Sequence, residues 1–367
     1  MENTSALAGL IFFLAFAGLI LVHEMGHFLA ARFFGIEVEE FGFGLPPKML
    51  TLFHWKETKF TLNWLPLGGF VRPKGENDPT IPGGLAAASP WRRLGVLFAG
   101  PIMNLLAGLL IFVFLVRMDG YHDLGRVMLA EIAPNSPAES AGMLAGDVVV
   151  QAAGQPVTDF DTLSGIIRAH LEQPMEFVLQ RGEETLTVTA TPRSNPPEGQ
   201  GAIGIRMSEV VIPVNTWGGS VRYAAASVYD QGRALLLLPA KLLRGTLAPE
   251  EGRFIGLKGI FDIFNLTVST DVQSRETLPT TTAQAPTYST LYLIATLTIS
   301  IGLFNLLPFP ALDGGRILFV FPELITRRRV PHQFENAVHA TGMLLLLLFM
   351  LYINVMDFIN PIVLPTP

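Results

Sequence analysis

Val22-His23-Glu24-Met25-Gly26-His27 stands near the end of the first long apolar segment, which covers about residues 6–30. Histidines four residues apart share one face of a helix, so His23 and His27 can bind the same metal ion. Glu24 can reach a water molecule at that metal without being a ligand itself. Ionisable residues inside a membrane helix are costly and usually serve a functional site. The stretch therefore predicts a membrane helix that carries a zinc hydrolase site.

The composition indicates a protein embedded in a membrane. Of the 367 residues, 50% are hydrophobic and 15% are charged, which is more apolar than a soluble globular chain. The net charge of −6 gives no reason to expect nucleic acid as a partner. Because the chain has no cysteine, disulfides and thiolate metal ligands are excluded. The initial Met-Glu-Asn lacks the basic start of a signal peptide, so residues 6–30 are predicted to be a retained span.

Four apolar segments reach the roughly 20 residues that are needed to cross a hydrocarbon core. They cover about residues 6–30, 94–116, 288–307 and 339–359. A shorter stretch, Ala234–Leu243, is interrupted by Pro239 and is predicted to be an amphipathic or surface helix. The expected fold is thus membrane α-helical, with an N-terminal membrane core in residues 1–119 and a C-terminal membrane core in residues 288–367.

Lysine and arginine in the short loops indicate which side of the membrane is cytoplasmic. Residues 31–93 and 316–338, which connect predicted spans, are both rich in these two residue types. The two connections lie on the same side if all four segments cross the membrane. That side is predicted to be cytoplasmic, which leaves residues 117–287 and both termini outside.

Residues 40–93 contain short alternating apolar runs broken by glycine and proline, as in Phe60–Val71. This pattern predicts β-hairpin strands in the connection between the first two spans. A strand edge near the site could pair with the backbone of an extended substrate. A loop hairpin that merely packs on the helices explains the spacing equally well.

Between residues 120 and 207 the composition is that of a soluble domain. Alternating stretches such as Met128–Ile132 and Val148–Ala152 predict strands. Ser136-Pro137 predicts the start of a short helix, with serine as the N-cap, and a second helix is expected over Phe160–His170. The sequence thus predicts a small, β-rich α+β domain in residues 120–207. Residues 208–287 are expected to form a linker outside the cytoplasm with amphipathic helices.

A catalytic zinc site needs three protein ligands and one open position. The first motif supplies two, so the third should come from another apolar segment. Asp313 is the candidate, because it follows a span interrupted by Pro308 and Pro310 and precedes two glycines. Broken backbone at membrane depth is tolerated where it is buried in protein or lines a cavity. Alternatively, Asp313 could cap a helix or pair with Arg316.

Asn104 and Asn305 stand beside these motifs in the sequence. We expect them to position a substrate carbonyl or its oxyanion, although asparagines in membrane helices also form hydrogen bonds between helices. The remaining histidines have no comparable partners in the sequence and are expected to be ordinary surface or loop residues: His54, His122, His170, His332 and His339.

Taken together, the motifs resemble those of the site-2 protease family of intramembrane metalloproteases, in particular the bacterial regulator-of-sigma-E type. Residues 120–207 resemble a single PDZ domain through Ser136-Pro137-Ala138 and Gly142–Asp147. The stretches that match the family occur in its order: His23–His27, Phe41–Gly44, Pro66–Val71, Gly100–Asn104, and Asn305–Arg316 with Leu312-Asp313-Gly314-Gly315.

The resemblance implies that His23, His27 and Asp313 bind zinc and that Glu24 activates the water. It also implies that Gly68-Gly69-Phe70 belongs to a membrane-associated β-hairpin loop near the site, which can hold the substrate as an added strand. The substrates would be single-pass membrane proteins such as anti-sigma factors, or remnant signal peptides. The protein would be a multi-pass protein of the bacterial inner membrane. Its active site would lie near the cytoplasmic side, and its PDZ domain, outside the cytoplasm, would act as a filter or sensor.

The chain departs from the family pattern in three places. Many such relatives carry two PDZ domains, whereas the length here leaves room for one. Arg253–Ile260 replaces a stretch that often resembles Gly-Pro-Val-Gly, and the run 267–287, rich in threonine, serine and proline, is atypical. These departures concern how substrates reach the site and leave the catalytic motifs intact.

Two other classes of function compete with a protease. A membrane PDZ scaffold or receptor could keep a structural zinc site, but such a site needs no base and Glu24 is present. A zinc transporter would need a relay of ligands along a path, whereas these motifs form one closed set. The sequence makes no prediction of the oligomeric state.

Overall fold

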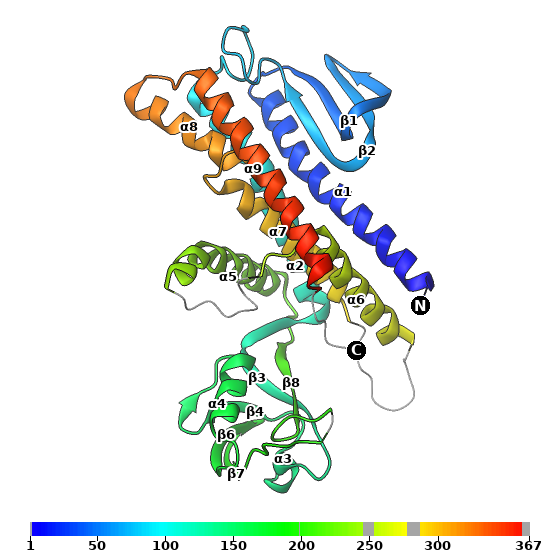
Figure 1. The fold of residues 1–367 in the computed structure, drawn as a ribbon, viewed down its shortest axis with the longest axis vertical. Helices are drawn as coiled ribbons and strands as arrows, with labels where there is room; N and C mark the ends of the chain where they lie inside the picture. The colour runs from blue at the N-terminus through cyan, green and yellow to red at the C-terminus, as the bar shows by residue number, and fades with distance from the viewer. Residues whose placement is uncertain (1, 198, 245–252, 277–286, 362–367) are drawn as a thin grey trace. The chain divides into compact units, whose positions relative to one another are not determined.

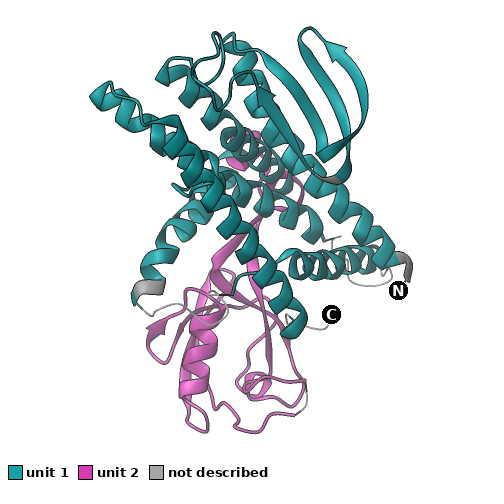
Figure 2. Cartoon of the chain, turned by 45° about the horizontal axis from the view of Figure 1, so that its top comes forward, with its two compact units in different colours: residues 1–115, 221–367 teal, residues 116–220 magenta. Residues whose placement is uncertain are grey.

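The computed structural model of the protein describes residues 2–197, 199–244, 253–276 and 287–361 (Figure 1). The chain divides into two units, residues 1–115 with 221–367 and residues 116–220 (Figure 2). Part of the run 267–287 falls outside the described residues, namely 277–286.

Most of the helices belong to the larger unit, and four of them are long and apolar enough to cross a membrane. These candidate spans are Thr4–Phe33, Pro90–Asp119, Ser289–Leu306 and His332–Ile359. The prediction of four spans is therefore confirmed. The helices are α1 (Glu2–Phe33), α2 (Pro90–Asp119), α5 (Trp217–Arg244), α6 (Leu257–Glu276), α7 (Ser289–Leu306), α8 (Asp313–Thr326) and α9 (His332–Ile359).

The predicted linker contains α5 and α6, and α6 packs among the candidate spans. It contacts α1, α7 and α9, and the ring of Phe12 lies 5.6 Å from that of Phe261 and 5.3 Å from that of Phe264. The segment Ala234–Leu243 lies within α5, which has Pro239 inside it. Helix α6 is thus part of the helical unit, because its aromatic side chains complete the packing around α1.

Two buried carboxylates hold the beginnings of α6 and α7. Asp357 of α9 is 2% exposed and accepts hydrogen bonds from the N–H groups of Gly256 and Gly259. Asp271 of α6 accepts from the N–H groups of Ser289 and Thr290. A carboxylate at a helix N-terminus satisfies donors that have no partner within the helix. These contacts fix α6 and α7 relative to their neighbours.

The connection between α1 and α2 forms an antiparallel sheet from β1 (Val38–Trp55) and β2 (Thr58–Pro73). Each strand folds back on itself, because residues 60–62 pair with residues 41–43 and also with residues around 50–53. Residues 69–71 pair with 41–43 on the opposite side. The predicted hairpin strands are confirmed, in the form of a sheet four segments wide with residues 69–73 along one edge, beside α1.

The smaller unit is a β-rich domain with two short helices. Its sheet has the order β7-β6-β4-β3-β8, with β5 paired to β4. Strand β8 pairs with β3 from Tyr121↔Ile212 to Ile132↔Ile205, so the domain continues past the expected boundary at residue 207. The elements are β3 (Tyr121–Ile132), α3 (Pro137–Ser140), β4 (Val148–Ala152), β5 (Gln155–Pro156), α4 (Phe160–Ala169), β6 (Met175–Arg181), β7 (Glu184–Ala190) and β8 (Ile205–Ile212).

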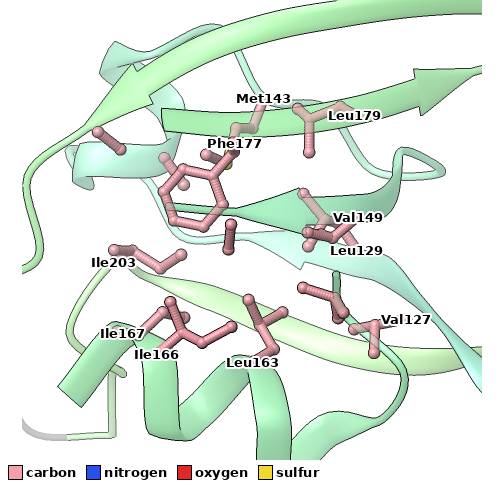
Figure 3. Packing of buried hydrophobic residues seen from close by; sticks show 14 of the residues in the cluster. Val127, Leu129, Met143, Val149, Leu163, Ile166, Ile167, Phe177, Leu179 and Ile203 are labelled. Carbon is pink, nitrogen blue, oxygen red and sulfur yellow. The ribbon is translucent and has the colours of Figure 1, made fainter. Parts of the chain in front are cut away.

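The core of this unit lies between the sheet and α4 (Figure 3). Leu163, Ile166 and Ile167 of α4 are buried against strand residues that include Phe177 and Leu179. The helix positions follow the i, i+3, i+4 spacing of an amphipathic helix. The first helix begins at the cap that the sequence suggests, because Ser136 accepts a hydrogen bond from the N–H of Glu139. Asp159 caps the second helix by accepting from the N–H of Thr162.

Candidate metal centre and active site

The two histidines of the first motif meet a carboxylate from the other end of the chain. The Nε2 atoms of His23 and His27 lie 3.1 Å apart on α1. Oδ2 of Asp313, the first residue of α8, lies 3.0 Å from the first and 3.3 Å from the second. The cluster is enclosed, since His23 is 8% exposed. Among the described residues, it is the group of three that could hold a metal ion.

The path of the chain before α8 explains why Asp313 reaches the histidines. Residues 307–312 fold back over the first turn of α8, so that a Cβ on Gly314 would stand 2.2 Å from the carbonyl oxygen of Leu307. A Cβ on Gly315 would stand 2.3 Å from that of Phe309. Both distances are shorter than a van der Waals contact, so only glycine fits at these two positions. The carboxylate of Asp313 is thereby held within the helical unit.

The described part of the chain shows neither alternative role of Asp313. It is the first residue of α8, one position after the N-cap Leu312. Arg316 pairs instead with Glu76. The carboxylate is left to face the two imidazoles.

The spacing of the three ligand atoms fits zinc. Ligands about 2.0 Å from a tetrahedral zinc ion lie roughly 3.3 Å from one another, close to the three separations in this cluster. Gly100 of α2 supplies the space, because a Cβ there would lie 2.4 Å from Nε2 of His27 and 2.8 Å from Nε2 of His23. Two imidazoles and one carboxylate are also a donor set found in catalytic zinc sites with an open position.

The far sides of both imidazoles face polar groups on α2. Nδ1 of His27 lies 2.8 Å from the carbonyl oxygen of Val96, which can only accept, so this nitrogen carries the proton and Nε2 is free for a metal. Nδ1 of His23 lies 3.4 Å from the amide of Asn104, which is fully buried. Within the described residues, the Oδ1 atom of Asn104 has no hydrogen-bond partner. Asn104 thus stands behind the histidine, on the side away from the cluster.

Glu24 projects toward the edge of the sheet. Its Oε2 accepts a hydrogen bond of 2.9 Å from the N–H of Val71. Gly69 lies beside it, where a Cβ would come within 3.6 Å of Cγ of Glu24. The carboxylate is therefore fixed by the edge segment 69–73 while it remains next to the histidines.

A groove of about 320 Å³ leads to this carboxylate. Its walls are α1 and the sheet, and its lining residues are mostly apolar or glycine. They are Phe13, Leu14, Ala17, Gly18, Leu21 and Glu24 of α1, with Phe41, Gly42, Phe43, Gly44, Leu62, Gly68 and Gly69 of the sheet.

The other residues that the sequence suggested for substrate contact have different positions. Gly68 and Gly69 line the groove. The ring of Phe70 lies over Gly42, where an added Cβ would stand 2.3 Å from it. Nδ2 of Asn305 donates to the carbonyl oxygen of Ile301 in its own helix, whereas Asn104 contacts His23. The structure does not bring the two asparagines together.

Two residues near the metal cluster have roles that the sequence pattern does not indicate. Gly100 belongs to a family motif, but only the folded structure shows that it leaves space beside the two histidines. His339 was expected to be an ordinary surface or loop residue, and this expectation is wrong. Its Nδ1 accepts a hydrogen bond of 3.0 Å from the N–H of Ala311, a residue with a φ of 84°. His339 therefore supports the turn that precedes Asp313.

Comparison with known proteins identifies the family of the chain. The profile of peptidase family M50 matches residues 11–349. A candidate zinc metalloprotease of Clostridium perfringens is 34% identical over 353 residues, covering 95% of this chain and 98% of the relative. The zinc metalloprotease RasP of Geobacillus kaustophilus is 26% identical over 427 residues, covering 94% of this chain and 96% of the relative. This chain belongs to peptidase family M50, the site-2 protease family of zinc metalloproteases.

Proposed function

We propose that the protein is an intramembrane endopeptidase that cleaves single-pass membrane proteins, with His23, His27 and Asp313 as the zinc ligands and Glu24 as the general base. The observation that carries the proposal is the position of Glu24. Glu24 directly follows His23 in a candidate span, and it lines the apolar groove between α1 and the sheet. A site with a structural metal would not need a carboxylate in that place.

The residues of the chain divide the chemistry between them. When bound, zinc supplies a Lewis acid that activates water for attack on a peptide carbonyl. Glu24 accepts the proton of the attacking water and passes it to the leaving amine. Because the N–H of Val71 holds Oε2 of Glu24, Oε1 is the oxygen available for that transfer. Asn104 and the Val96 carbonyl orient the two imidazoles.

The sheet edge supports binding of the substrate as an extended strand. A transmembrane helix has its amides paired internally, so it must unwind before hydrolysis. Pairing with residues 69–73 could replace the lost hydrogen bonds, and Gly68 and Gly69 leave room for a backbone beside Glu24. Substrates with helix-breaking or small residues near the cut site should therefore be favoured.

The class of substrate follows from this geometry and from the family. Anti-sigma-factor-like proteins or remnant signal peptides would present a single span to the groove. The unit of residues 116–220, which we interpret as a PDZ domain, would limit the size of the outer portion of the substrate. In this proposal it lies outside the cytoplasm of a bacterium, and the active site lies near the cytoplasmic side of the inner membrane.

A reporter fused at residue 160 should then be detected outside the cytoplasm, and a cytoplasmic signal would overturn this topology.

The decisive experiment compares purified wild type with Glu24→Gln in detergent, using a single-span peptide with a short outer segment. We expect cleavage by the wild type alone, while both proteins retain equal amounts of zinc. Equal cleavage by both would show that Glu24 is not the base. Binding of zinc by both proteins with no cleavage by either, across a panel of single-span peptides, would favour a membrane scaffold with a structural site.

A further inference from the structure

Helix α8 has a second apolar face in addition to the one that packs in the core. Ile317 and Val320 are buried against Leu94 and Leu97 of α2. The adjoining stripe of Leu318, Phe321 and Ile325 is exposed by 51%, 44% and 82%. Spacings of three and four residues keep these three side chains on one side of the helix. Packing within the unit therefore does not account for the stripe.

The exposed stripe forms one wall of a groove of about 510 Å³, and the beginning of α9 forms the other. Apart from Thr326, every residue that lines the groove is apolar. The lining residues on α9 and just before it are Phe334, which is 58% exposed, and Val330.

Three arginines stand in the sequence between Thr326 and Val330, both of which line the groove. Arg327, Arg328 and Arg329 follow α8 directly. The guanidinium of Arg329 donates to the carbonyl oxygen of Ala86. Arg327 and Arg328 are exposed, and within the described part of the chain neither forms an ion pair with a carboxylate. Two positive charges thus remain available beside an apolar groove.

Helix α8 begins at the candidate metal site with Asp313 and ends at the three arginines, so we infer that its second half approaches a membrane surface. It has 14 residues, too few to cross a bilayer, and it connects the candidate spans α7 and α9. A short amphipathic helix with arginines at its polar end is suited to lie in the lipid headgroup region with its apolar side chains in the acyl layer. Basic residues there attract anionic lipids.

We propose that α8 and the start of α9 form a binding site for an anionic phospholipid. An acyl chain would occupy the groove beside Phe321 and Ile325, and the headgroup phosphate would accept hydrogen bonds from Arg327 and Arg328. The site also anchors the segment that begins with Asp313. Glu323 of the same helix is already tied to Arg93 of α2 at 2.7 Å, so lipid would hold the outer side of a helix whose inner side is fixed.

The absence of cysteine in the chain permits a clean test. We would replace Ile325 with cysteine, attach a fluorophore, and reconstitute the full-length protein in phosphatidylcholine bilayers. Small equal amounts of doxyl-labelled phosphatidylglycerol or doxyl-labelled phosphatidylcholine are then added. Because each arginine near a surface favours an anionic lipid about fivefold at low salt, phosphatidylglycerol should be the much stronger quencher. A label at Leu318→Cys should report the same preference, in case one position disturbs the helix.

In the double variant Arg327→Gln/Arg328→Gln, the two doxyl-labelled lipids should quench the fluorophore almost equally. The matched control combines Arg126→Gln with Arg168→Gln, two exposed arginines of the smaller unit, and should keep the preference. Equal quenching by both lipids in the parent protein would overturn the proposal, as would an unchanged preference in the Arg327/Arg328 variant. No quenching by either lipid would show that protein covers the stripe, and would overturn it as well.

Discussion

His23 and Asp313 are separated by 290 positions in the sequence, and yet their side chains meet. The space beside the histidines is so small that a methyl group on Gly100 would fill it. The cluster depends on residues of opposite character. Three side chains supply ligand atoms, and Gly100 contributes by having no side chain. At this scale the site is sensitive both to the loss of a donor atom and to the gain of a carbon atom.

Asp313→Asn tests the third ligand. An amide binds zinc far less well than a carboxylate, so zinc affinity should fall by more than the roughly 10–100-fold typical for loss of an outer hydrogen-bond partner, and cleavage should stop. Zinc content after dialysis against a chelator measures the first effect. Asp161→Asn, on an exposed position of α4, is the matched control. Full zinc retention in Asp313→Asn would remove this residue from the ligand set.

Gly100→Ala tests the space for the metal. The new Cβ would overlap the position between the two Nε2 atoms, so zinc binding should be strongly reduced although all the ligands remain. Isothermal titration with zinc measures the affinity. Gly165→Ala is the control, because nothing lies within 4 Å of a Cβ at that position. If both variants bind zinc equally, the metal does not occupy the space beside Gly100.

At the scale of elements, the edge segment 69–73 stands out because it has two roles. It pairs with residues 38–43 on one side, and its Val71 N–H holds Glu24 on the other. A substrate strand would have to pair with a segment that also positions the base.

Gly69→Val tests this edge. An added Cβ would lie 3.1 Å from the carbonyl oxygen of Gly42 and 3.6 Å from Cγ of Glu24, so the larger side chain would crowd both the paired strand and the carboxylate. We expect cleavage to fall at least about tenfold while zinc content is unchanged, since a small misplacement of a catalytic group is costly. Gly218→Val, at a position with no neighbour within 4 Å, should cleave normally. Unimpaired cleavage by Gly69→Val would exclude a role for this edge.

In the smaller unit, Asp147 joins β4 to β6. Its carboxylate is 1% exposed and accepts two hydrogen bonds of 2.7 Å from Arg181. The hydrogen bonds from Arg181 lower the pKa of Asp147. A lowered pKa in the folded state contributes stability that is present above the unfolded value of about 3.9 and is lost as the pH falls.

Arg181→Gln should therefore lower the free energy of unfolding of this unit at neutral pH. Between about pH 5 and pH 3, the variant should lose less stability than the wild type does. Amide hydrogen exchange in β4 and β6 of the full-length protein measures both effects. Arg168→Gln, on the exposed side of α4, should behave as the wild type does. Identical exchange in Arg181→Gln and wild type at both pH values would contradict the assigned role of the pair.

The whole molecule joins a helical unit that holds the candidate site to a β-rich unit of contiguous sequence. The two ends of the β-rich unit are partners in one ladder, Tyr121↔Ile212, so they lie about 5 Å apart. The unit can therefore be removed without stretching the chain that remains. This arrangement suits an inserted domain that affects access and takes no part in the chemistry.

Replacing residues 121–212 by a short glycine-serine linker tests that division. Hydrolysis of a single-span substrate with a short outer segment should continue, and substrates with long outer segments should be cleaved as well as short ones. Gel assays with a matched pair of substrates measure the ratio. If the deletion variant binds zinc but cleaves neither substrate, the unit is needed for activity and is not a filter.

Features that depend on neighbouring residues could be read from the sequence. The four candidate spans, the histidines on one face of α1 and the helix cap at Ser136 all follow from local periodicity and composition. The order of the motifs was enough to identify the family. The strand character of residues 40–73 was also visible, because alternation and glycine placement are local properties.

The tertiary structure decided the features that depend on distant contacts. Only the folded chain shows that Gly100 makes space for a metal and that His339 supports the turn before Asp313. The same is true of Asn104, which lies behind His23, and of Glu24, whose carboxylate is held by the sheet edge. These contacts join segments tens to hundreds of residues apart, and no local pattern encodes which distant atoms will meet. Local pattern encodes the candidate spans and the residue types of the site, whereas the packing of distant segments decides which of those atoms meet.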